Sequence, residues 1–200
     1  TEVNASNADV WGQMYSSAAN FNIGGTLNSA NKTLVSVQNL NTVNAKDLNL
    51  KGLWEAGNLT LTAVNSLQQA GAIYAQNNLA LQANAMSLTG AVQAGHKLNA
   101  NAVQQLTVDS QAQLFSSDSI ELSADAIQLD GYAGAENSMT AIAANNLTAG
   151  TTAQLESNGL IALQSKNADI DLQGKTYAQN QMISAQKNLN IAAGASVTTV

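Results

Sequence analysis

The chain has 200 residues and a formal net charge of −6, with no cysteine and no proline, and all seven of its basic residues are lysines. The acidic balance argues against nucleic acid and against an anionic membrane surface as partners, because both are bound through clustered basic residues. Without cysteine there is no disulfide framework or thiol chemistry, and without a long apolar run the sequence predicts no transmembrane helix.

A repeat of about twenty residues occupies positions 40–200, whereas positions 1–39 follow it poorly. We predict irregular or atypical first coils over 1–39, in which 21–25 (FNIGG) resembles one coil. Trp11, Met14 and Tyr15 are expected either to cover the end of the stack, since an open solenoid end is a sheet edge that needs protection, or to belong to an irregular piece of a preceding coil.

Each repeat over 40–200 begins with a strand in which apolar and polar residues alternate, as in 59–63 (LTLTA). The period is two, as in a strand, and not 3.6, as in a helix. The predicted first residues of these strands, 19 to 22 positions apart, are Leu40, Leu59, Leu79, Leu98, Ile120, Met139, Ile161 and Met182.

A second strand starts 7 to 9 residues later and leads into a corner of small residues, such as Gly52, Gly71 and Gly90. A third strand follows the corner. Counting eight positions from each second strand gives one apolar column that we predict to point inward: Ala56, Ala75, Ala94, Leu114, Ala135, Leu155, Ala178 and Val197.

These patterns predict an all-β protein, a parallel β-helix of about 20 residues and three short strands per coil, in which stacked coils close a continuous apolar core. Residues 40–200 form one continuous solenoid. We expect the chain to be a piece of a longer array, because the repeat reaches the last residues unchanged. Asparagines that precede strands, such as Asn58, Asn78 and Asn188, form side-chain ladders between coils or simply favour turns.

The sequence contains few groups for chemistry, and we predict no enzyme, no metal and no cofactor. His96 is the only histidine, so it has no second histidine for a relay or a metal site. Asp169 and Asp171 point outward on one strand, and Asp130 lies in another column two coils away. Such a pair is about 10 Å apart or more, beyond the range for glycoside hydrolysis. A polysaccharide-degrading β-helix enzyme is the alternative reading.

The units 58–63 (NLTLTA), 78–83 (NLALQA) and 188–193 (NLNIAA) resemble the filamentous haemagglutinin repeat, and so do the corners Gly52–Ala56 and Gly131–Ala135. The resemblance covers about 40–200. It implies a right-handed β-helix on the surface of a Gram-negative bacterium, from a large exoprotein of two-partner secretion. Such exoproteins are adhesins or the stalks of contact-dependent growth inhibition effectors.

The function that this resemblance implies is an extracellular, non-catalytic stalk or adhesive segment that contacts another cell. Its partners would be a receptor, protein or glycan, on that cell and the outer-membrane transporter during secretion. The segment itself is expected to be a monomeric rod. Outward aromatic and apolar residues of the third strand are the candidate partner contacts, because exposed aromatics mark interfaces more often than polar residues do: Leu53, Tyr74, Tyr132 and Tyr177. Two pairs of alternatives remain. The whole exoprotein is an adhesin or a toxin-delivery stalk, and this segment is a binder or a passive spacer.

Overall fold

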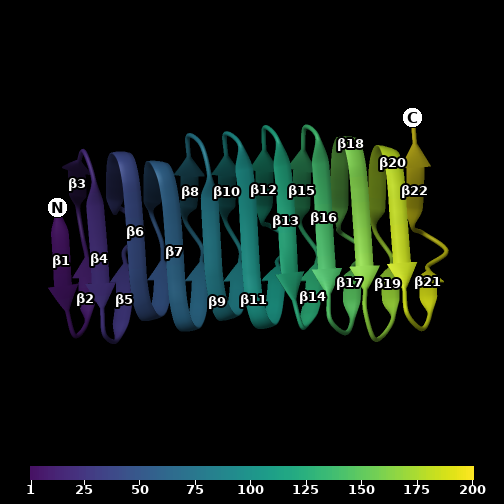
Figure 1. Ribbon diagram of the computed structural model, residues 1–200, viewed down its shortest axis with the longest axis horizontal. Helices are drawn as coiled ribbons and strands as arrows, with labels where there is room; N and C mark the ends of the chain where they lie inside the picture. Colours follow the sequence, from purple (N-terminus) through teal and green to yellow (C-terminus); the bar gives the residue numbers. More distant parts are fainter.

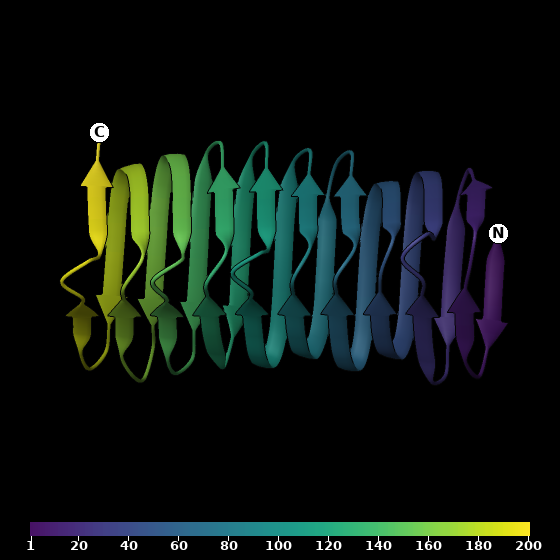
Figure 2. The same cartoon turned by 180° about the vertical axis from the view of Figure 1, so that it is seen from behind.

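The computed structural model describes residues 1–200, apart from the side chain of Leu40. The described chain forms 22 strands and no helix, joined in a single sheet that winds as a right-handed solenoid (Figures 1 and 2). The two termini lie at opposite ends of the rod. The described residues form no helix, and therefore no helix long and apolar enough to cross a membrane.

Sixteen of the strands are short and straight: β1 (Glu2–Ala5), β2 (Ala8–Val10), β3 (Gln13–Ser16), β4 (Ala19–Ile23), β5 (Thr26–Ser29), β8 (Ala72–Ala75), β10 (Ala91–Ala94), β12 (Gln113–Ser116), β13 (Ser119–Ala124), β14 (Ala126–Leu129), β15 (Tyr132–Ala135), β16 (Ser138–Ala143), β17 (Leu147–Ala149), β19 (Ile170–Leu172), β21 (Leu189–Ile191) and β22 (Ser196–Thr199). Six strands continue around one or two corners of a coil: β6 (Leu34–Leu50), β7 (Leu53–Gln69), β9 (Leu79–Leu88), β11 (Lys97–Val108), β18 (Gln154–Ser165) and β20 (Lys175–Ala185).

All strand pairs are parallel, and each strand pairs with the equivalent strand of the next coil. Three faces result. Face A is the ladder that contains residues 59–63, face B the one that contains 66–69, and face C the one that contains 53–56. The ladder of face A runs β1–β4–β6–β7–β9–β11–β13–β16–β18–β20 and therefore defines ten coils. At about 4.8 Å per coil the rod is roughly 48 Å long.

The inward residues of face A stack as the alternation predicts. Leu59, Leu79, Leu98, Ile120 and Ile161 lie in one column and are at most 1% exposed. Because successive side chains of a strand point to opposite sides, this column fixes the whole core-facing set of face A. The predicted fold, a parallel β-helix of about 20 residues per coil, is confirmed.

At both ends of this column the predicted first residue is not the inward one. The side chain of Leu40 lies outside the described part of the chain, and the residue paired with Leu59 is Asn41, which is fully buried. In the last coil Gln181 pairs with Ile161, so Met182 points outward and is 54% exposed. The strand start predicted at Met182 is therefore wrong by one residue. A shift of one residue reverses the direction of every side chain in a strand.

Corners between faces B and C have two lengths. Short corners have two residues with glycine second, as at Gly52, Gly71 and Gly131. Long corners have four residues and close with a hydrogen bond from the fourth N–H to the first carbonyl, as from Ala112 to Asp109 and from Ala153 to Gly150. Glycine permits the tighter path because it has no Cβ to collide with the neighbouring coil.

The two extra corner residues correct the predicted inward column of face C. Leu114 and Leu155 align with Val92 and Ala133, not with Ala94 and Ala135. The residues that follow them by two positions, Ser116 and Ser157, occupy the alanine column instead, and Val197 is shifted in the same way against Thr176. All of these positions still face inward, since a shift of two residues keeps the face.

Residues 1–39 belong to the same ladders as the rest, through the pairs of β1 with β4, β2 with β5 and β3 with β6. Their difference lies in the side chains. Met14 packs against the core, but Trp11 and Tyr15 are 78% and 66% exposed, so these two aromatic residues do not cover the end of the stack.

Candidate functional site

Face C carries the four candidate partner contacts in two outward columns. Leu53 and Tyr132 belong to one column, and Tyr74 and Tyr177 to the other, which also contains Phe115. Tyr74 lies five coils from Tyr177 along this column, and Leu53 lies one coil further toward the N-terminus. The structure therefore brings together only Tyr132 and Tyr177 of the predicted set.

Tyr132 and Tyr177 line a common hollow of about 160 Å³ on face C. We call this hollow the face C notch. Its lining residues come from β12, β15, β18 and β20 and the corner after β15: Phe115, Tyr132, Gly134, Ala135, Glu136, Glu156, Ser157, Asn158 and Tyr177.

Gly134 opens the notch. It is the residue of the outward column between Phe115 and Glu156, so the column lacks one side chain there. The ring of Tyr132 lies across this gap, because a Cβ added to Gly134 would collide with the phenol oxygen and ring of Tyr132. An aromatic ring over a strand glycine replaces the packing that glycine lacks. Tyr132 is thus held in place, whereas Tyr177 remains 45% exposed.

Two carboxylates border the notch, and each accepts one hydrogen bond. The Tyr132 hydroxyl donates to Glu156 at 3.2 Å, and the Asn158 side-chain amide donates to Glu136 at 2.6 Å. Burial, the negative charge of Glu156, the hydrogen bond to it and the charge of Glu136 all raise the pKa of Tyr132 above its ordinary value. The local potential is therefore negative.

Phe115 and Glu156 were missing from the sequence-based set of contacts. Both follow a long corner, and the assumption of equal corners displaced them from the outward column by two residues. The signal was present in the sequence. Short corners have glycine at the position of Gly131. In the coils where the equivalent residue is Ser110 or Thr151, the corner is two residues longer.

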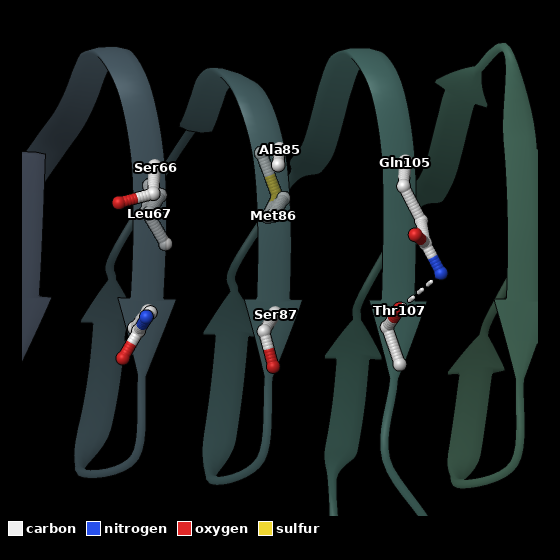
Figure 3. A pocket seen from close by; sticks show the side chains of 8 residues that line it. Ser66, Leu67, Ala85, Met86, Ser87, Gln105 and Thr107 are labelled. Atoms are coloured by element: carbon white, nitrogen blue, oxygen red, sulfur yellow. Dashed lines mark hydrogen bonds between the residues drawn. The ribbon is translucent and has the colours of Figure 1, made fainter.

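A second hollow, of about 190 Å³, lies on face B (Figure 3). Ser66, Ala85 and Gln105 form one of its outward columns, and Ser87 and Thr107 belong to the other. Gln105 donates a hydrogen bond to Thr107 at 3.3 Å. None of the residues that line this hollow is titratable. The Ser66 hydroxyl donates a hydrogen bond to the carboxylate of Asp47 in the preceding coil at 2.6 Å.

Carboxylates along the rod are bonded to amides of the following coil. In six such pairs an asparagine donates to an aspartate or glutamate 19 to 22 residues earlier at 2.6 to 3.0 Å: Asp9 with Asn28, Asp118 with Asn137, Asp125 with Asn145, Glu136 with Asn158, Asp169 with Asn188 and Asp171 with Asn190. Asn28 continues this series as an amide ladder, since Asn49 donates to it in turn. Of the asparagines expected to form ladders before strands, Asn78 donates to Asn58 at 3.3 Å.

The residues considered for catalysis are not brought together. The Asp171 carboxylate accepts a hydrogen bond from Asn190. The Asp130 carboxylate lies two coils before Asp171 and accepts from Gln128. His96 is exposed at a corner. Among the described residues, no three of the types His, Cys, Asp and Glu lie close enough to hold a metal ion.

No protein-family model, no curated protein and no solved structure matches this chain. The likeness to the filamentous haemagglutinin repeat, and with it the bacterial surface location, stays a prediction from the sequence.

Proposed function

We propose that this chain is a non-catalytic extracellular stalk or adhesive segment of a bacterial surface exoprotein, which contacts a receptor or surface component of another cell. The observation that carries the proposal is the unbroken parallel stack of ten coils. Each added coil extends such a rod without a new fold. The likeness of residues 40–200 to the haemagglutinin repeat supports the surface location and two-partner secretion.

The arrangement of polar groups also supports a structural or binding role. Catalysis by two carboxylates needs them to face each other across a substrate. Here Asp125, Asp169 and Asp171 are instead bonded to asparagines of the next coil. These hydrogen bonds stabilise the stack of coils. Face C is the surface that carries several of the outward aromatic side chains.

The test is binding of the fluorescently labelled chain to candidate target cells, measured by flow cytometry. We expect the parent to bind and the triple variant Tyr74→Ser, Tyr132→Ser, Tyr177→Ser to lose most of its binding. The free energy of unfolding of the triple variant should change by only about 1 kcal/mol, because the three positions point outward. Tyr15→Ser is the matched control, since Tyr15 lies in the same outward column eight coils from Tyr177.

Two results would contradict the proposal. A parent that binds no cell type makes the segment a passive spacer. Release of oligosaccharides from a polysaccharide by the purified chain, abolished by Asp171→Asn, makes it an enzyme.

A further inference from the structure

The two carboxylates of the face C notch keep free hydrogen-bond acceptors. The Tyr132 hydroxyl already donates to Glu156 and one N–H of the Asn158 amide to Glu136, while Tyr177 also brings its hydroxyl to the notch. Only Oε2 of each carboxylate takes part in these bonds, so Oε1 of Glu136 and of Glu156 accepts none from the described residues. A ligand that donates hydrogen bonds can therefore use these two oxygens.

The notch also has no cation of its own. In the described part of the chain the one ion pair joins Lys97 to Glu121 at 2.5 Å, on face A. Lys175 lines a neighbouring hollow with Glu156 and Tyr177 but forms no ion pair with Glu156. Neither Glu136 nor Glu156 has a cationic partner at ion-pair distance among the described residues, in a chain whose net charge is −6.

Aromatic faces complete the notch. Tyr132 is fixed over Gly134. In the outward column Phe115 lies one coil before Gly134, and Tyr177 lies one coil after Glu156. Phe21 and Trp54 are the ring pair found among the described residues. No ring pair is found in the notch, and Tyr177 is 45% exposed, so its ring is accessible to a ligand. Ring faces attract cations through their quadrupole.

The geometry points to the face C notch as a binding site for a side-chain organic cation, the ammonium of a lysine or the guanidinium of an arginine, presented by a partner protein. Glu136 and Glu156 lie on adjacent coils about 8 Å apart at their Cα atoms and accept its N–H donors. The rings of Tyr132 and Tyr177 border the cation and its aliphatic stem. This inference rests on the proposed function for the source of the partner, the surface of another cell.

Two other ligand classes fit these groups poorly. A hard metal ion such as Ca²⁺ requires six to eight oxygen ligands, whereas the notch offers two carboxylates next to aromatic rings. A neutral sugar brings no positive charge to Glu136 and Glu156, the two carboxylates of the notch.

The experiment is a titration of the ¹⁵N-labelled chain with tetralysine, followed by amide chemical shifts, with tetralysine acetylated on its side chains as the neutral probe. We expect shifts confined to the amides around Gly134, Glu156 and Tyr177, and weak or no shifts with the acetylated peptide. Glu156→Gln should lower the affinity about two- to fivefold, the effect of one exposed charge pair. Lys175→Gln should raise the affinity, because it removes a like charge beside the ligand.

Glu55→Gln is the matched control. Glu55 occupies the same outward column five coils from Glu156, next to Tyr74, and has the same charge. The site assignment is overturned if Glu55→Gln weakens binding as much as Glu156→Gln, or if the acetylated peptide binds as tightly as tetralysine. The amide spectrum of each variant shows directly that it is folded.

Cell binding measured on the same samples separates this inference from the proposed function. A parent chain that binds cells but shows no shifts with tetralysine overturns the cation site and leaves the adhesive role intact. A chain that binds tetralysine in the notch but binds no cell supports the cation site and overturns the adhesive role.

Discussion

Eight polar side chains are buried in the described part of this core, and five of them bond to the backbone of a neighbouring coil: Ser29, Thr33, Gln69, Ser116 and Ser165. Gln69, at 1% exposure, donates to the carbonyls of Gly71 and Ala91 and accepts from the N–H of Gly90. Ser29 accepts the indole N–H of Trp54 at 3.1 Å. Such bonds compensate the loss of hydration on burial.

Asn41 is the exception among the described residues, because neither its side-chain nitrogen nor its oxygen has a partner. It stands between Ala19 and Leu59 in the inward column of face A. Asn41→Leu should therefore raise the free energy of unfolding by about 1–3 kcal/mol, since an unsatisfied buried amide is replaced by an apolar group of similar size. Urea denaturation measures the change. Asn44→Leu, at an exposed position of the same strand, is the control, and an equal gain there would refute the assignment.

Tyr132 should titrate above the ordinary pH range of a tyrosine side chain. Burial and the charges of Glu156 and Glu136 raise its pKa above the ordinary value of about 10. The neutral phenol is thus favoured in the folded state, and its contribution to stability is present below about pH 10 and lost as the pH rises through the folded-state pKa. Ultraviolet difference titration should show one late step that Tyr132→Phe removes. A step still present in that variant would contradict the cause given.

Corners decide how each coil is placed on the previous one. Gly52, Gly71 and Gly90 stack in three successive coils, and Gly52 has a positive φ of 74°. A Cβ at Gly71 would collide with the backbone of Gly52, and one at Gly90 with the carbonyl oxygen of Gly71. The short corner therefore requires glycine because of the coil below it, and the long corner removes this requirement with two more residues.

Gly71→Ala should lower the free energy of unfolding by about 1–3 kcal/mol, since backbone atoms must move to make room for the Cβ. Thermal denaturation followed by circular dichroism measures the loss. Gly194→Ala provides the comparison, because nothing lies within 4 Å of a Cβ there. Equal effects of the two substitutions would show that glycine is used at Gly71 for its flexibility alone.

The whole molecule is a one-dimensional stack, in which each coil contacts only its two neighbours. Inner coils bury their inward residues completely, as Leu98 and Leu122 show. In the last coil the core-type residues Ile191 and Val197 remain 54% and 43% exposed. Stability should therefore decrease toward both ends of this chain (Figure 1).

Native-state hydrogen exchange should show this gradient. We expect the amides of β21 and β22, and of β1 to β3, to exchange at least about tenfold faster than those of the central strands β11 and β13, because one neighbouring coil is absent on their outer side. The comparison is internal to one sample, so no variant is required. Uniform protection along the chain would show instead that the ten coils open as one unit.

Most of the fold was predictable from the sequence because a solenoid repeats one local problem. Alternation within each strand and constancy between repeats determined the strands, the inward column from Leu59 to Ile161 and the parallel stacking. Tyr74, Tyr132 and Tyr177 were correctly expected on outward positions, since orientation depends only on the parity of the position in the strand.

What only the tertiary structure decided is how neighbouring coils align. Ser110 in place of glycine marks the corner Asp109–Ala112 as unusual in the sequence, but only the pairing with the neighbouring coil shows that it has two extra residues and displaces Phe115 by two positions. Asn41 faces inward for a similar reason, because the register of β6 against β7 shifts after Val37. The face C notch exists because two neighbouring coils bring Tyr132, Gly134 and Glu156 side by side. Contacts between coils, about twenty residues apart in sequence, set these features, and no single repeat contains them.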